Sequence, residues 1–222
     1  SIMATINVNR QGRIIGLANT IFSTARTSDS GIATDGVSGD QNVQYFLGRG
    51  KKRFTRVFLH FDTSGITSTL SAAHLDVTGG GSSPDPNDSI IIKSTAFGGD
   101  GGTALATSDM YSSLDYSTAY STELTTWSTS GNNEYTLTAA ALADIKNNDH
   151  FTLAIIDHDN DYANTDTATI SDIIIDFDTT ITLDYTAAAT GYTHDVSSVA
   201  AASIGKVNTV AAASIGKINS VD

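Results

Sequence analysis

The sequence predicts an all-β fold, a jelly roll or β-sandwich with one short helix, followed by a repetitive tail. The main observation is that residues 56–77 read as two alternating strands joined by a Ser/Thr/Gly connection. The apolar positions are Val57, Leu59 and Phe61 in the first strand and Ala73, Leu75 and Val77 in the second. Many other short apolar runs are separated by polar loops, a pattern typical of sandwiches and barrels.

The remaining elements follow from the same pattern. We expect opening strands at the apolar pairs 14–15 and 21–22 and a Ser/Asp/Gly loop over 29–42. Further strands are expected at 43–48, 89–97, 134–137, 151–156, 173–177 and 181–185. Residues 103–130 are ambiguous. A helix is expected over 138–147, with Thr138 as its cap.

The composition changes after Tyr185, and the sequence predicts a domain over about residues 4–186 and a separate tail over 187–222. The tail holds two 11-residue repeats, 199–209 and 210–220, that differ only conservatively. Two copies cannot bury their own apolar positions. The tail is therefore either frayed or a strap that docks on a neighbouring subunit. In the second case its contacts would come from Ile204, Val207, Ile215 and Ile218.

Charge separates one short basic segment from an acidic body. The net charge is −12, which argues against a duplex nucleic-acid partner, and no stretch approaches 18 apolar residues, so no membrane span is expected. The basic run consists of Arg49, Lys51, Lys52, Arg53 and Arg56. It could solubilise an edge strand. It could also bind an acidic glycan, a phosphate or the acidic face of another subunit, as in head-to-tail self-association.

One acidic segment is a candidate cation site. Carboxylates alternate from residue 157 to 161, and clustered Asp and Asn oxygens in a loop suit Ca²⁺. The predicted ligands are Asp157, Asp159, Asp161 and Asp166. The alternative is a solvated acidic loop that binds no ion.

Four aromatic residues are a candidate glycan-binding surface. Aromatic faces pack on the apolar surfaces of sugar rings. The candidates are Tyr111, Tyr116, Tyr120 and Trp127, although a single Trp more often belongs to a core. No zinc-binding histidine spacing, serine nucleophile motif, cysteine or phosphate loop is present, so an enzyme is not expected.

The run from Arg56 to Val77 resembles the DNRLRE-type jelly-roll domains. The shared features are Arg56, the strand ending in Phe61-Asp62, a Ser/Thr-rich bend and the Ala72-Ala73 strand. The tail is similar to Ile-Gly-Lys-Val-Asn tails of phage-like and marine microbial appendage proteins. These resemblances imply a virion or extracellular location and a structural surface-assembly subunit, such as a capsid decoration protein, fibre or filament subunit. Its partners would be itself or neighbouring subunits. The alternative is a carbohydrate-binding module or adhesin domain that contacts surface polysaccharide.

Overall fold

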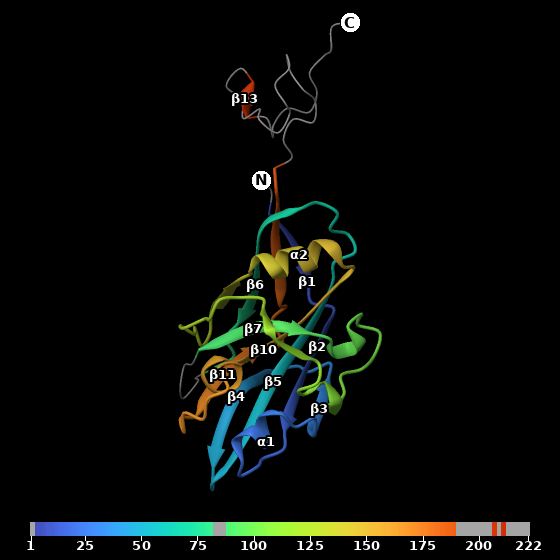
Figure 1. Cartoon of the computed structure of the whole chain (residues 1–222). Helices are drawn as coiled ribbons and strands as arrows, with labels where there is room; N and C mark the ends of the chain where they lie inside the picture. The colour runs from blue at the N-terminus through green and yellow to red at the C-terminus, as the bar shows by residue number, and fades with distance from the viewer. Residues whose placement is uncertain (1–2, 82–87, 190–205, 208–209, 212–222) are drawn as a thin grey trace, which may run out of the picture.

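The computed structural model describes residues 3–81, 88–189, 206–207 and 210–211 and confirms the all-β sandwich (Figure 1). Sheet A contains, in spatial order, β1 (Met3–Asn7), β12 (Thr182–Ala187), β6 (Leu70–Thr78) and β9 (Asn132–Thr136). Sheet B contains β11 (Ser171–Asp176), β4 (Asp40–Gly48), β5 (Lys51–Asp62), β10 (His150–Asp157), β7 (Ser89–Ser94) and β8 (Leu114–Ala119). β2 (Arg10–Gly16) pairs with β5 and with β3 (Gly31–Asp35). The pairs within both sheets are antiparallel.

The long strand β5 organises sheet B. Its first five residues pair with β4 and residues 57–62 pair with β10, while β2 pairs with residues 55–60. The predicted alternation from 56 to 77 is confirmed, but β5 and β6 belong to opposite sheets. The connection between them crosses the sandwich. The apolar faces of β5 and β6 therefore meet in one core rather than lying side by side.

The inner core lies between the two sheets. It includes the six apolar positions predicted from residues 56–77, of which Leu59 and Leu75 have no exposed surface. The predicted helix is confirmed as α2 (Ala139–Asn147), and the Thr138 hydroxyl accepts the N–H of Ala141 at its N-terminus. Ala141 and Ile145 of α2 are buried in the inner core. α2 thus covers one end of the sandwich (Figure 1).

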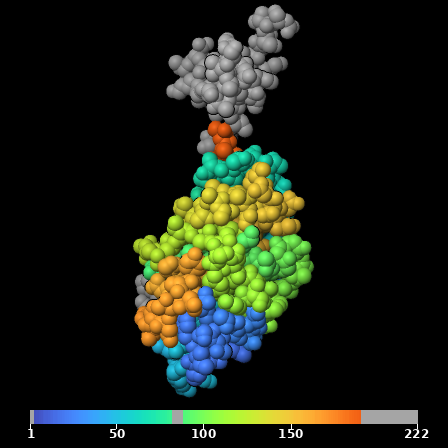
Figure 2. Space-filling view, in the orientation of Figure 1, coloured from blue at the N-terminus to red at the C-terminus, as the bar shows by residue number. Residues whose placement is uncertain are grey.

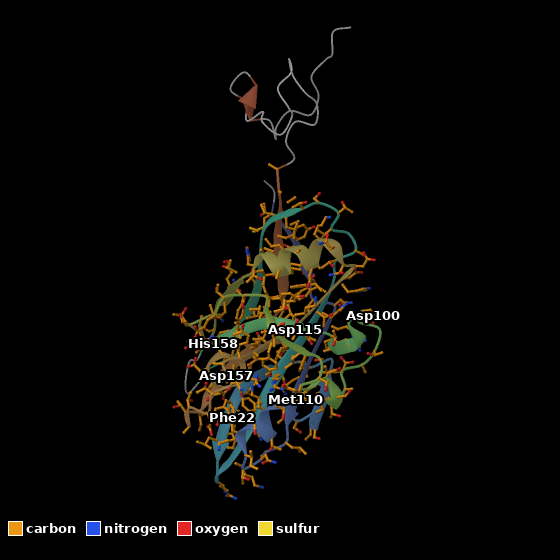
Figure 3. All side chains as sticks on the ribbon, in the orientation of Figure 1. Phe22, Asp100, Met110, Asp115, Asp157 and His158 are labelled. Atoms are coloured by element: carbon orange, nitrogen blue, oxygen red, sulfur yellow. The ribbon has the colours of Figure 1, made fainter. Side chains whose placement is uncertain are left out.

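A second core covers the outer face of sheet B. Phe54 and Phe58 of β5 are fully buried there, so both faces of this strand are covered. The covering segments include α1 (Phe22–Arg26), η1 (Ala96–Gly98) and the residues that flank η2 (Thr107–Asp109). Figure 2 shows these segments, blue and green, side by side on one face, and Figure 3 labels Phe22 in α1 and Met110 directly after η2. The outer layer therefore draws together residues from distant parts of the chain.

Three local predictions are wrong. The strand expected over 89–97 ends at residue 94, because the chain turns into η1. The pair Ile21-Phe22 forms no strand, because the side-chain oxygen of Asn19 accepts the N–H of Ile21 and the chain turns into α1. The segment 29–42 is not a loop, since it contains β3 and the start of β4. The only large apolar side chain of β3, Ile32, is 65 % exposed, so this strand carries no apolar alternation that a sequence pattern could report.

The two ends of the domain differ. The N-terminus and the end of β12 lie at one end, and the β4–β5 hairpin projects from the other (Figure 1). Beyond the domain, β13 (Lys206–Val207) pairs with β14 (Val210–Ala211). None of the described helices has the length and apolarity needed to cross a bilayer.

Candidate functional site

Basic side chains without carboxylate partners gather at the hairpin end of sheet B. We define the basic face as Arg13, Arg49, Lys51 and Arg53. Arg13 pairs with Val57 across β2 and β5, and side chains of paired residues leave a sheet on the same side. Alternation along β5 places Arg53 and Lys51 on that side as well. Arg49 lies between β4 and β5, at the hairpin tip.

The two arginines of the sheet lie close enough to affect each other. Burial lowers the pKa of Arg13, and the charge of Arg53 lowers it further. The Nε atoms of both are buried without a hydrogen-bond partner. A guanidinium group binds a planar oxyanion through paired N–H donors, so a carboxylate suits these two arginines as a ligand.

Neighbouring side chains orient Arg53. Its guanidinium lies 4.9 Å from the ring centroid of Phe46, and its Nη2 donates to the side-chain oxygen of Gln44 at 3.2 Å. Within residues 3–81 and 88–189, no member of the basic face forms an ion pair with a carboxylate. The charge of this surface is therefore available to another molecule.

The structure divides the predicted basic run. Arg49 and Lys51 are exposed, and Arg53 is half-buried. Lys52 points to the opposite side of β5 and pairs with Asp166 at 3.0 Å. Arg56 is fully buried, so it cannot contribute to a surface contact as expected. Three of the five residues thus belong to the basic face.

Arg56 instead holds the outer layer together through Asp161. Its Nε and Nη2 donate to the two carboxylate oxygens of Asp161 at 2.6 and 2.8 Å. Nη1 donates to the carbonyl of Met110, and Nη2 also donates to the carbonyl of Arg26 at 2.8 Å. Tyr116 donates to Asp161 at 2.7 Å, and burial raises the pKa of this tyrosine, as does the nearby carboxylate. These contacts stabilise the fold and are not available to a binding partner, because every group involved is buried or half-buried.

The four predicted calcium ligands each have different partners in the structure. Asp157 accepts the N–H groups of Asn160 and Asp161 at the start of η3 (His158–Tyr162), and burial raises its pKa. Asp159 is exposed beside His158, and Asp166 accepts the hydroxyl of Tyr45 at 2.7 Å and pairs with Lys52. Asp161 is held by the arginines. Calcium binding by this set stays a prediction.

The four predicted glycan-binding aromatics are divided between the two cores. The ring centroids of Tyr111 and Tyr116 lie 5.7 Å apart in the outer layer. The guanidinium carbon of Arg26 lies 4.2 Å from the ring centroid of Tyr116. Tyr120 is buried against Phe151 in the inner core, and Trp127 packs against the same core. The structure does not bring the four into one platform.

The tail residues of the assembly prediction fall largely outside the described residues. Ile204, Ile215 and Ile218 are among those not described, and Val207 is described only as part of β13.

Sequence reasoning missed Arg13 of the basic face and Phe46, the ring that the Arg53 guanidinium contacts. Arg13 stands alone between Gly12 and Ile14, and Phe46 looked like an ordinary strand residue. The signal for both is strand register, because pairing of β2 and β4 with β5 brings them beside Arg53. Comparison with known proteins adds no family to this geometry, since no protein-family model and no curated protein matches the chain.

Proposed function

We propose that the chain is a structural subunit that assembles with copies of itself or with neighbouring subunits, on a virion as a decoration or fibre protein or in an extracellular filament. The observation that supports this most directly is the basic face. It carries unpaired cations at one end of a molecule whose net charge is −12. A second copy offers the complementary charge.

The position of the basic face favours a head-to-tail contact rather than a two-fold symmetric one. It lies at the hairpin end, away from the N-terminus and the end of β12 (Figure 1). A contact between different surfaces of identical subunits is heterologous, and it continues into rings or filaments. The sandwich supplies a rigid body for such a contact, because the hairpin strands continue directly into the two cores.

The first test is the mass in solution of the full-length chain at low and high salt. We expect self-association at low ionic strength that is lost at about 1 M NaCl, where charges are screened beyond roughly 3 Å. The double variant R49E/K51E should remain monomeric at low salt, because both side chains are exposed and the reversal alters charge but not packing.

The matched control is K146E, at an exposed lysine of α2 away from the basic face; it is compared with the single variant K51E, which changes the net charge by the same amount. K146E should assemble like the parent protein. A parent protein that stays monomeric at low salt at every concentration would contradict the proposal. Assembly that ignores both molar salt and R49E/K51E would also contradict it.

A carbohydrate-binding or adhesin function is the second candidate, and one observation favours it. Arg53 is stacked beside Phe46 on an open sheet surface, and an aromatic ring next to a guanidinium suits an acidic sugar. Retention of the monomer on polygalacturonate but not on neutral dextran would support this candidate. Loss of that retention in Arg53→Gln would locate the contact.

A further inference from the structure

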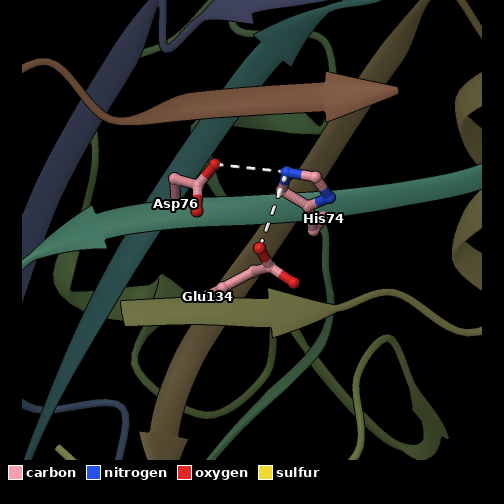
Figure 4. Close-up of side chains that lie close together, drawn as sticks. All are labelled: His74, Asp76 and Glu134. Atoms are coloured by element: carbon pink, nitrogen blue, oxygen red, sulfur yellow. Dashed lines mark ion pairs between the residues drawn. The ribbon is translucent and has the colours of Figure 1, made fainter. Parts of the chain in front are cut away.

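A histidine surrounded by three carboxylates lies on the solvent face of sheet A. His74 and Asp76 are two residues apart on β6 and share one face of the strand. Asp184 of β12 is the cross-strand partner of His74, and Glu134 of β9 is the partner of Asp76. Figure 4 shows the side chains of His74, Asp76 and Glu134 converging above the sheet.

All three carboxylates approach the same nitrogen. The Nε2 atom of His74 lies 3.4 Å from Oδ2 of Asp76, 3.7 Å from Oδ2 of Asp184 and 3.9 Å from Oε2 of Glu134. These separations are longer than N–H···O hydrogen bonds, which span about 2.7–3.2 Å. They are close to the spacing of about 3.3 Å between ligand atoms of a tetrahedral zinc ion bonded at about 2.0–2.1 Å.

The two aspartates are held in place by their other oxygens. Asn132 donates to Oδ1 of Asp76 at 2.6 Å, and the hydroxyl of Thr5 donates to Oδ1 of Asp184. In each case the remaining oxygen, Oδ2, is the one that faces His74. Hydrogen bonds that orient the free ligand atom are the usual outer shell of a metal site.

The charge of the cluster favours a cation. Within the part of the chain that the structure describes, no Lys or Arg forms an ion pair with these three carboxylates. The side chains of Asp76 and Asp184 are only 16 % and 13 % exposed, so water shields them poorly from each other. Glu134 is 54 % exposed and can adjust its position.

We propose that His74, Asp76 and Glu134, whose ligand atoms all lie within 4.8 Å of one another, bind a divalent transition-metal ion of the zinc type. Asp184, whose Oδ2 lies 3.7 Å from Nε2 of His74, is the nearest additional carboxylate. One imidazole with carboxylates suits Zn²⁺, whereas Ca²⁺ prefers six to eight oxygen ligands. Such an ion joins β6 and β9 on the solvent face of sheet A. It stabilises the folded state by an amount that rises with the logarithm of the free metal concentration once that concentration exceeds the dissociation constant. Its binding is independent of assembly through the basic face.

A second histidine cluster, in which the imidazole lies closer to its carboxylates than in the His74 cluster, supplies a control. Nδ1 of His158 lies 3.0 Å from both Oε1 of Glu123 and Oδ1 of Asp159. These are hydrogen-bond distances, so this imidazole contacts its carboxylates directly.

The test is calorimetric titration of the full-length, untagged protein with ZnCl2 at neutral pH, together with the melting temperature in a roughly tenfold excess of ZnCl2. We expect one Zn²⁺ per chain and a higher melting temperature. His74→Gln and Asp184→Asn should each weaken binding about tenfold or more, and Asn132→Ala should weaken it with the ligands still present. His158→Gln should bind like the parent protein.

Three results would overturn the inference. They are absence of Zn²⁺ binding by the parent protein, loss of binding in His158→Gln with retention in His74→Gln, and equal affinity for Ca²⁺. Far-UV circular dichroism of each variant distinguishes a lost ligand from a lost fold. A protein that binds zinc but stays monomeric would contradict only the proposed function.

Discussion

Replacing Arg56 by methionine is expected to lower the free energy of unfolding by about 3–5 kcal/mol, as removal of one partner from a buried ion pair usually does. The substitution leaves the carboxylate of Asp161 buried and takes the donors from two carbonyl groups, those of Met110 and Arg26. Arg26 stays 3.5 Å from Asp161 and offsets part of the loss. Urea unfolding at neutral pH measures the change.

The control is Lys51→Met, which removes a charge from the same strand at an exposed position. It should change the free energy of unfolding by no more than about 0.5 kcal/mol. Arg56→Lys should rescue little, because an ammonium group lacks the planar fork that contacts both oxygens of Asp161. A loss of less than about 1 kcal/mol in Arg56→Met would show that the pair is not structural.

The basic run shows which features of the site can be predicted from the sequence and which cannot. The side of the strand that each residue faces is predictable, and the partner of Arg56 is not. Alternation along a strand already separates Lys51 and Arg53 from Lys52 and Arg56, provided that the strand begins at residue 51. The sequence did not indicate that β5 begins at residue 51, because its first residues are mostly charged and the apolar alternation begins only at residue 57. The pairing of Arg56 with Asp161 was beyond reach, since the two residues lie 105 positions apart and meet through the outer layer.

The histidine cluster on sheet A was also only partly predictable, because some of its contacts are local in the sequence and others are not. His74 and Asp76 are visible in the sequence as neighbours on one face of a strand. Their two other partners come from β9 and β12, and only the register of sheet A places them there. The strands themselves were largely predictable, because an alternating apolar pattern is local, whereas the pairing of strands is not.

The outer layer was the part of the fold that could not be predicted from the sequence. Its segments are polar, irregular or very short, as in residues 103–113 and the five-residue helix α1. Phe54 and Phe58 on the outer face of β5 required a cover. Arg56 and His60 interrupt the apolar pattern on that face, so the sequence does not distinguish this strand from one that is buried on a single face.

Phe58→Ala tests whether this outer layer is a true core. We expect it to lower the free energy of unfolding by about 3–5 kcal/mol, as large-to-small changes at buried phenylalanines do. Phe58 has no exposed surface, and its cross-strand partners are Gly12 and Ala154. Neither neighbour can fill the space of the lost ring, so the cavity should remain.

Phe46→Ala is the matched control, because it removes the same side chain from a half-buried position on the open side of the hairpin. It should cost about 1 kcal/mol or less, since little apolar surface leaves water there. Urea unfolding of both variants gives the comparison. If both variants lower the free energy of unfolding by a similar small amount, the outer layer contributes little to the stability of sheet B. A large loss confined to Phe58→Ala would mean that β5 is stabilised from both faces, and that the basic face extends from a rigid strand.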